Sequence, residues 1–193
     1  MSMLIMKSVG ASLLGAYSET KYGPAFGTGS LGLPALFGAT PLLLTSLSFW
    51  ALLHGFVVVG KSRSKYIKLA KEAGETEVDE RYGLPNLYAQ GTSKYAKAFN
   101  CIQRSHQHIF ETFTAVCVTS MVAAVHYPIC AAIATLTYGV GRVSLSNGYA
   151  NEEGDPSKRY SSRFAPLMWY GILASIVLST ISSVSFVAGK PIL

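Results

Sequence analysis

The chain has few charged residues for its length. Only 13% of its 193 residues are Asp, Glu, Lys or Arg, whereas an ordinary soluble domain carries roughly 25%. A soluble globule of this size needs more ionisable surface than that, so we exclude this class. Half of the residues are hydrophobic, which excludes an intrinsically disordered chain. The sequence has only three cysteines and no C-x-x-C spacing, so it is not a disulfide scaffold and we expect no metal site.

Three stretches contain no Asp, Glu, Lys or Arg at all: 31–59, 112–141 and 164–189. Each is longer than the roughly 20 apolar residues that a helix needs to cross a bilayer. The middle stretch is interrupted by His-Tyr-Pro at 126–128, a turn signal that predicts a helical hairpin. We therefore predict an all-α integral membrane protein whose protomer is a four-helix bundle, with four transmembrane helices within residues 31–189.

The basic residues are concentrated between the predicted spans. Nine of the 16 Lys and Arg residues lie from Lys61 to Arg104, and Lys158, Arg159 and Arg163 lie between spans three and four. The positive-inside rule predicts that both segments are cytosolic and that both chain termini lie on the other side. Basic juxtamembrane segments meet anionic lipid or small anions more often than DNA, so we expect membrane lipid and no nucleic acid as a partner.

Residues 1–30 precede the first span and are predicted to be an extension outside the four-helix domain. The part before residue 18 is apolar, has no acidic residue and contains one lysine, Lys7. Such a segment is typical of a cleaved signal, a targeting extension or an interfacial helix, and all three alternatives stay open. Gly and Pro are frequent in 23–34, which predicts a loop that leads into the first span.

Ionisable residues lie at membrane depth in the second and third spans. The charge-free parts of these spans, 112–125 and 129–141, are too short to cross a bilayer. Extending them to the required length brings Arg104 and Glu111 into the second helix and Arg142 into the third. Charged side chains at that depth are costly and normally face the protein interior or an aqueous cavity, so they indicate a functional site.

Helical geometry places these residues on shared faces. At about 100° per residue, Arg104, His108 and Glu111 lie on one face of the second helix. Arg142 and Tyr149 lie on one face of the third. Counted in residues from the turn at 126–128, Glu111 lies at about the same depth as Arg142, and Arg104 at about the same depth as Tyr149. Arg104 has no obvious acidic partner. The pattern predicts a polar cleft that opens to the cytosol; the alternative is a buried Glu111–Arg142 ion pair that locks the hairpin.

The residue types in this cleft suit a small zwitterion. Arginine binds carboxylates through its planar guanidinium, which makes two parallel contacts, and a glutamate suits an ammonium group. Glutathione carries two carboxylates and one ammonium, so it fits this complement, although many other metabolites fit equally. A cation beside the sulfur would lower the pKa of the thiol and yield the nucleophilic thiolate.

The segment 99–111, FNCIQRSHQHIFE, closely resembles the second-helix motif of the MAPEG superfamily, the membrane-associated proteins in eicosanoid and glutathione metabolism. Within it, the chain is most similar to the type-3 microsomal glutathione transferases. Further matches to that branch occur, in the same order, at 61–66, 126–128, 141–143, 148–149 and 155–159. The resemblance covers roughly residues 40–187 and leaves the N-terminal extension outside it.

The resemblance implies a homotrimer in the endoplasmic reticulum or a related membrane, with glutathione as co-substrate bound between protomers on the cytosolic side. The implied activity is glutathione transfer to lipophilic electrophiles, with lipid hydroperoxide reduction as a further activity. Arg159 matches the arginine that stabilises the thiolate, and is the predicted catalytic residue. The residues predicted to bind glutathione, from this match and from the cleft, are Arg63, Arg104, His108, Glu111, Arg142, Tyr149 and Lys158.

Some positions depart from the family pattern. His108 stands where the motif has asparagine, Leu145 where it has tyrosine, and Ser64 where close relatives have a basic residue. Leucine at position 145 lacks the hydroxyl of the family's tyrosine. This difference would suit an alternative function, a non-enzymatic lipid-binding scaffold of the same superfamily. A small channel or transporter is a third alternative, although the spans lack the broken helices that transporters use.

Overall fold

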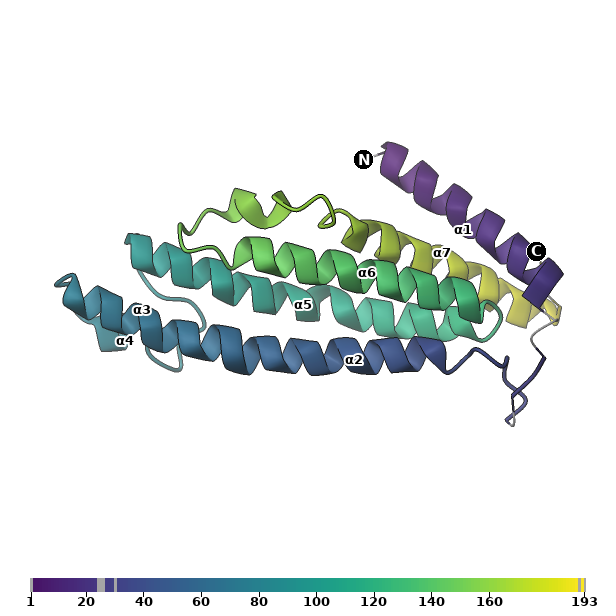
Figure 1. The fold of residues 1–193 in the computed structure, drawn as a ribbon, viewed down its shortest axis with the longest axis horizontal. Helices are drawn as coiled ribbons and strands as arrows, with labels where there is room; N and C mark the ends of the chain where they lie inside the picture. The colour runs from purple at the N-terminus through teal and green to yellow at the C-terminus, as the bar shows by residue number, and fades with distance from the viewer. Residues whose placement is uncertain (1, 24–26, 30, 191, 193) are drawn as a thin grey trace. The chain divides into compact units, whose positions relative to one another are not determined.

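The computed structural model describes residues 2–23, 27–29, 31–190 and 192, and this part of the chain is helical with no strand (Figure 1). The all-α prediction is therefore confirmed. In chain order, the elements are α1 (Ser2–Tyr22), α2 (Ala39–Leu53), the π-helical η2 (His54–Val59), α3 (Gly60–Glu72), α4 (Val78–Tyr82), α5 (Lys94–Ala124), α6 (Pro128–Tyr149), the 3-10 helix η3 (Pro156–Tyr160) and α7 (Leu167–Ala188).

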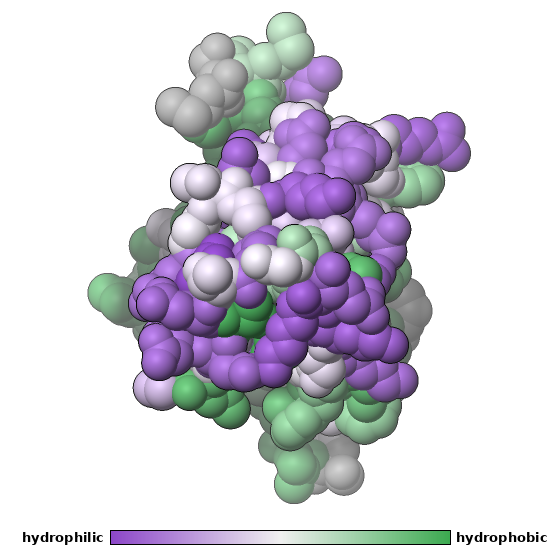
Figure 2. All heavy atoms as spheres, turned by 90° about the vertical axis from the view of Figure 1, so that its left-hand side faces the viewer, coloured by the Kyte–Doolittle hydropathy of each residue, from purple (hydrophilic) through white to green (hydrophobic). Residues whose placement is uncertain are grey.

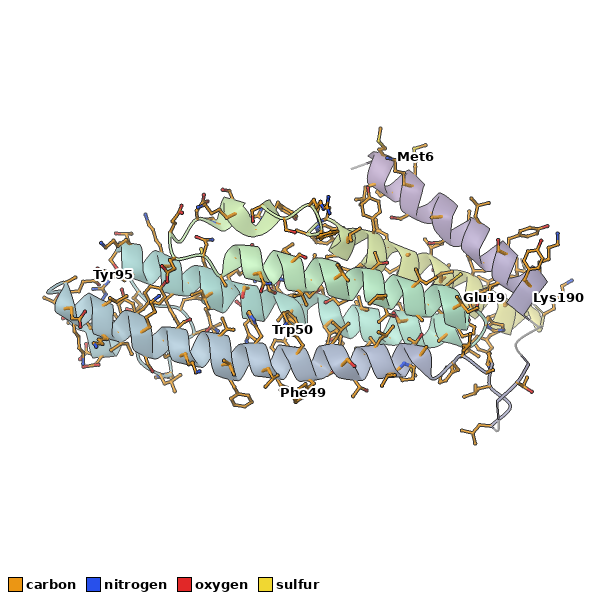
Figure 3. All side chains as sticks on the ribbon, in the orientation of Figure 1. Met6, Glu19, Phe49, Trp50, Tyr95 and Lys190 are labelled. Atoms are coloured by element: carbon orange, nitrogen blue, oxygen red, sulfur yellow. The ribbon has the colours of Figure 1, made fainter. Side chains whose placement is uncertain are left out.

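Among the described residues, three helical stretches are long and apolar enough to cross a membrane. They are Ala39–Glu72, which joins α2, η2 and α3, together with α6 and α7. Large apolar side chains on α2, such as Phe49, point away from the other helices (Figure 3), as lipid-facing residues do. The helix α5 has 31 residues and is long enough, but its polar side chains keep it out of this group. The chain is therefore an integral membrane protein, and its fourth span stays a prediction.

The chain forms two compact units. Unit 1 contains Met1–Leu47, Thr112–Gly141 and Pro166–Leu193, and unit 2 contains Ser48–Glu111 and Arg142–Ala165. The core of unit 1 is rich in small residues, whereas that of unit 2 includes three aromatic side chains, Tyr66, Tyr82 and Phe99. Each of the helices α2, α5 and α6 contributes residues to both units.

Small residues and hydroxyl groups join the helices of unit 1. Gly171 of α7 lies so close to α6 that a Cβ there would come within 2.6 Å of the Cα atom of Tyr138. Thr119 of α5 donates a hydrogen bond of 3.0 Å to the Ser175 hydroxyl of α7, and the hydroxyls of Thr112 and Tyr138 lie 2.9 Å apart. Close backbone approach and interhelical hydrogen bonds are the interactions that hold helices together in lipid.

The N-terminal helix α1 packs against α7 and is joined to α6 by one carboxylate. Glu19 is only 9% exposed, and its two oxygens accept hydrogen bonds from the backbone N–H groups of Ile129 (2.7 Å) and Cys130 (2.9 Å). These N–H groups belong to the first turn of α6, where no intrahelical acceptor is available and a negative charge is favoured. The predicted N-terminal extension is thus a docked helix over 2–22, while residues 1, 24–26 and 30 lie outside the described residues.

The start of α1 and the end of α7 lie at opposite ends of α7. Lys7, in the second turn of α1, and Tyr170, in the first turn of α7, line the same cavity, whereas Glu19 reaches the start of α6. At that other end, the His126 ring lies 2.7 Å from the hydroxyl of Ser182 near the end of α7. The described part of the chain therefore begins beside the start of α7 and finishes at its far end. Charge counting could not show this, because each terminal segment carries so few basic residues.

Replacing Glu19 by alanine removes the acceptor of two buried N–H groups. We expect the free energy of unfolding to fall by about 1–3 kcal/mol, and thermal unfolding in detergent, followed by circular dichroism, measures this. Glu80→Ala, which removes an exposed carboxylate of α4, is the matched control and should change stability by less than about 0.5 kcal/mol. An equal loss in the two variants would show that the Glu19 hydrogen bonds do not stabilise α6.

Candidate functional site

Unit 2 contains a cavity of about 750 Å³. Its walls come from the N-terminal half of α5, the loop 83–93 before it, the end of α6 and the loop that follows α6. Figure 2 views the end of the molecule that carries α3, α4 and the start of α5, and most of this face is hydrophilic. The lining residues are Tyr88, Lys97, Asn100, Cys101, Arg104, Tyr149, Glu153, Gly154, Asp155 and Pro156.

One face of α5 forms a continuous polar wall. Lys97, Asn100 and Arg104 line the cavity, and their spacing of three, four and seven residues places them on the same face of the helix. His108 and Glu111 continue this face by two further turns, as the sequence predicts. Arg104, Tyr149 and Lys97 thus line one cavity.

Arg104 has an acidic partner, which sequence reasoning missed. Its two terminal nitrogens each donate a hydrogen bond to an oxygen of Glu111, with the Nη2–Oε2 pair at 3.0 Å. Both side chains are partly exposed, at 38% and 44%. The guanidinium has five N–H donors, and Glu111 accepts from two of its nitrogens. Glu111 therefore orients Arg104 and does not line the cavity itself.

Arg142 forms hydrogen bonds with residues other than Glu111, the partner in the alternative prediction. Its side chain is 1% exposed and donates to the hydroxyl of Ser146 from Nη2 (2.9 Å) and from Nε (3.3 Å). Its Nη1 contacts Nδ1 of His108, and because a guanidinium can only donate, this ring nitrogen must be the acceptor. The alternative of a Glu111–Arg142 pair is thus replaced by Glu111 with Arg104, and by Arg142 with His108. Neither Arg142 nor His108 is among the cavity-lining residues.

The loop 83–93 is held against α5 by side-chain to backbone hydrogen bonds. The Asn100 amide donates to the carbonyl of Ala89 (2.9 Å) and accepts from its N–H (2.8 Å). The Tyr88 hydroxyl donates to the side-chain oxygen of Gln107. These contacts position Tyr88 in the cavity wall, a place that no pattern in the sequence indicated because it depends on the path of the loop.

Arg63 supports the same loop from α3. It donates to the backbone carbonyls of Tyr82 and Leu87, the latter at 3.3 Å. Its guanidinium lies 4.6 Å from the ring centroid of Phe99, within the range of a cation–π interaction. The structure therefore places Arg63 outside the cavity lining, with two of its nitrogens already engaged by protein carbonyls.

The predicted catalytic residue, Arg159, is not among the cavity-lining residues, but it contacts two of them. The Arg159 guanidinium lies 5.7 Å from the ring centroid of Tyr149, which is 8% exposed, and donates to the carbonyl of Pro156 at 3.1 Å. Both contacted residues line the cavity, so Arg159 lies directly beside it. The adjacent Lys158 is ion-paired with Glu153.

Two carboxylates on the same loop give the cavity a mixed charge. Glu153 and Asp155 line it together with Lys97 and Arg104. The Ser157 backbone N–H donates to Asp155 Oδ1 at 2.8 Å, and hydrogen bonding from Ser157 holds the pKa of Asp155 below its ordinary value. Asp155 is therefore negatively charged at neutral pH, and the cavity offers both anion-binding and cation-binding side chains.

Sequence reasoning identified Arg104 and Tyr149 but missed several lining residues. Lys97 lies two turns before Arg104 and Cys101 lies one turn before it, so extending this face of α5 backwards would have found them. Asp155 lies in the motif at 155–159, in which only the basic residues Lys158 and Arg159 were predicted to belong to the site. In the described part of the chain, no group of three or more His, Cys, Asp or Glu side chains is placed to hold a metal ion.

Comparison with known proteins matches most of the chain to one family. The sequence model of the MAPEG family matches residues 40–183. No solved structure matches the chain. All of the residues that line the cavity of unit 2 fall within the matched range, whereas α1 precedes it.

Gly154 is required where the loop after α6 touches α5. Its φ is +67°, and a Cβ there would lie 2.7 Å from the backbone nitrogen of Ala98. We expect Gly154→Ala to lower the free energy of unfolding by about 1–2 kcal/mol through backbone strain and by more through this clash, as measured by thermal unfolding. Gly74→Ala is the matched control, because Gly74 has φ +76° with no atom within 4 Å of its Cβ position. Equal losses would contradict the close approach.

Proposed function

Because the chain belongs to the MAPEG family, whose members use glutathione, we propose that it is a membrane glutathione transferase. It conjugates the glutathione thiolate to lipophilic electrophiles. With a lipid hydroperoxide, the same bound thiolate attacks the terminal peroxide oxygen and breaks the O–O bond, which gives the alcohol and glutathione sulfenic acid; a second glutathione then converts the sulfenic acid to the disulfide and water. The observation that carries this proposal is the mixed charge of the cavity in unit 2, where two basic and two acidic side chains line one space beside Arg159.

The charges of glutathione complement those of the cavity. Its two carboxylates would bind Lys97 and Arg104, which Glu111 holds in place. Its ammonium group would bind Asp155 or Glu153 on the opposite loop. Tyr149 contributes a hydroxyl beside these groups, and Lys158 holds Glu153 through their ion pair. Positioning both ends of the tripeptide fixes its central cysteine relative to the protein.

Arg159 supplies the chemistry at the sulfur. A guanidinium is always protonated, and a fixed positive charge beside a thiol lowers the thiol pKa so that the thiolate forms at neutral pH. The Tyr149 ring and the Pro156 carbonyl hold this guanidinium beside the cavity. The thiolate then attacks an electrophilic atom of the substrate, and Arg159 stabilises the negative charge on sulfur until the new bond forms.

The remaining assignments complete this proposal. The protomer crosses the membrane of the endoplasmic reticulum or a related organelle with α5 as its fourth span, and three protomers form a homotrimer. The basic segments between spans place the cavity of unit 2 on the cytosolic side, where glutathione is dissolved. Arg63, His108 and Arg142 act from behind the cavity wall, Arg63 by holding the loop 83–93 and the other two by fixing α5 against α6.

Arg159→Ala tests the catalytic assignment. Without the guanidinium the pKa of the bound thiol rises, so the ultraviolet absorbance of the thiolate disappears at neutral pH and turnover falls about 100-fold. Activity should recover in part as the pH is raised, because hydroxide then ionises the thiol. Arg163→Ala, a change of an exposed arginine in the same loop, is the control and should leave both quantities unchanged. Unaltered turnover in Arg159→Ala would exclude the role of Arg159.

Arg104→Lys tests the binding assignment, because it keeps the charge but loses the two-pronged geometry. We expect the Kd for glutathione, measured by calorimetry in detergent, to rise about tenfold or more, with little change in the thiolate absorbance at saturation. Arg163→Lys is the matched control. A complete absence of glutathione binding to the unaltered protein would instead favour the non-enzymatic scaffold.

A further inference from the structure

A second cavity lies in unit 1, where α1 crosses α6 and α7. Its volume is about 410 Å³. Figure 1 shows α1 running beside α7, with the two helices diverging toward the start of α1; residues of α1, α6 and α7 line the cavity, which we call the crevice. The α1 residues that line it are Lys7, Ser8, Ala11, Ser12 and Gly15; the others are Cys130, Ile133, Ala134, Thr137, Tyr170, Ala174 and Leu178.

The crevice exists because the facing side chains are small. Ala11 and Gly15 of α1 oppose Ala134 of α6 and Ala174 of α7, so the helices approach without filling the space between them. The other side of α1 exposes large apolar side chains, and Met6 points away from the rest of unit 1 (Figure 3). The outer face of α1 is therefore suited to lipid, and the crevice beside it is accessible to molecules dissolved in the bilayer.

One polar group in the crevice has an unmet hydrogen bond. Ser8 is 4% exposed, and its hydroxyl has no hydrogen-bond partner among the described residues. Buried hydroxyls are normally paired, since leaving one unpaired costs free energy. Ser8 and its neighbour in sequence, Lys7, both line the crevice. An acceptor atom of a bound ligand at this end would satisfy Ser8 and neutralise Lys7.

The two ends of α1 differ in charge. Lys7 lies at the end beside Tyr170 in the first turn of α7, whereas the carboxylate of Glu19 lies at the other end. An anionic head group is attracted to the first end, whereas at the second end the charge of Lys21 offsets that of Glu19. The apolar walls between them, from Ala11 to Gly15 and Leu178, suit a hydrocarbon chain.

We propose that this crevice is a binding site for a long-chain fatty acid. Its carboxylate contacts Lys7 and the Ser8 hydroxyl, and its single chain lies between α1 and the facing residues of α6 and α7. One crevice accommodates one chain, so a free fatty acid fits better than a phospholipid with two chains. The site lies in unit 1 and requires α1 as one of its walls. It does not depend on the glutathione chemistry proposed for unit 2.

Photolabelling tests the site on the full-length protein in phosphatidylcholine nanodiscs. The probe is oleate with a photoactivatable diazirine in its chain, and labelled peptides are identified by mass spectrometry. We expect label on α1, on 129–137 of α6 and on 170–178 of α7, with competition by unlabelled oleate. Uniform labelling of the lipid-exposed faces, including the exposed face of α2, would overturn the proposal.

Ala11→Phe fills the crevice from an exposed position of α1, so the helix should still fold and dock. We expect it to abolish competable labelling, whereas Leu14→Phe, on the outer face of α1, should leave the labelling unchanged. Glutathione binding should be the same in both variants, which separates this proposal from that for unit 2. Unchanged labelling in Ala11→Phe would overturn it.

Lys7→Gln isolates the head-group contact. We expect the competing oleate concentration to rise about fivefold, the effect of one lysine near an anionic lipid group, while Lys21→Gln, at the other end of the same helix, has no effect. Oleyl alcohol, which has the same chain without the charge, should compete equally well in both variants. An equal effect of Lys7→Gln and Lys21→Gln would show that the charge acts on the membrane surface and not in the crevice.

Discussion

Charged and polar groups on membrane-length helices must find their partners within the protein, because lipid offers none. The structure meets this constraint at three places with different partners. Glu19 accepts two backbone N–H groups at the start of α6, Arg142 donates to Ser146 and contacts His108, and Arg104 pairs with Glu111. The Glu19 pairing lies at the start of α6, the Arg142–His108 contact joins α6 to α5, and the Arg104–Glu111 pair orients the arginine at the cavity.

The helix α5 shows how one element serves both packing and chemistry. Its C-terminal part lies in unit 1 and donates a hydrogen bond from Thr119 to α7. Its N-terminal part lies in unit 2, where Lys97 and Arg104 line the cavity with the loop after α6. The cavity thus combines a rigid helical wall with two loops, and the loops bring the opposite charge. This combination supports a zwitterionic ligand better than a helical hairpin alone.

The N-terminal helix adds a second kind of surface. It precedes the range matched by the MAPEG family, yet it belongs to unit 1, where Glu19 joins it to α6. The space left by small residues between α1, α6 and α7 is apolar and ends at a lysine. A polar cavity in one unit and an amphiphile-sized crevice in the other are consistent with a protein that works on compounds dissolved in membranes.

The sequence by itself determined the membrane class, the helical hairpin around 126–128 and the shared face of Arg104, His108 and Glu111. These properties depend on composition and helical periodicity, which act along the chain. The tertiary structure decided which residues pair. The sequence argument paired residues of two helices that lie at the same depth, but long side chains can also contact residues at another depth. Arg104 thus contacts Glu111 on its own helix, across two turns or about 10.5 Å of helical rise. The tertiary structure also decided the docking of α1 and the positions of Tyr88, Glu153 and Asp155, because loop paths and contacts between distant segments depend on three-dimensional packing and leave no periodic signal.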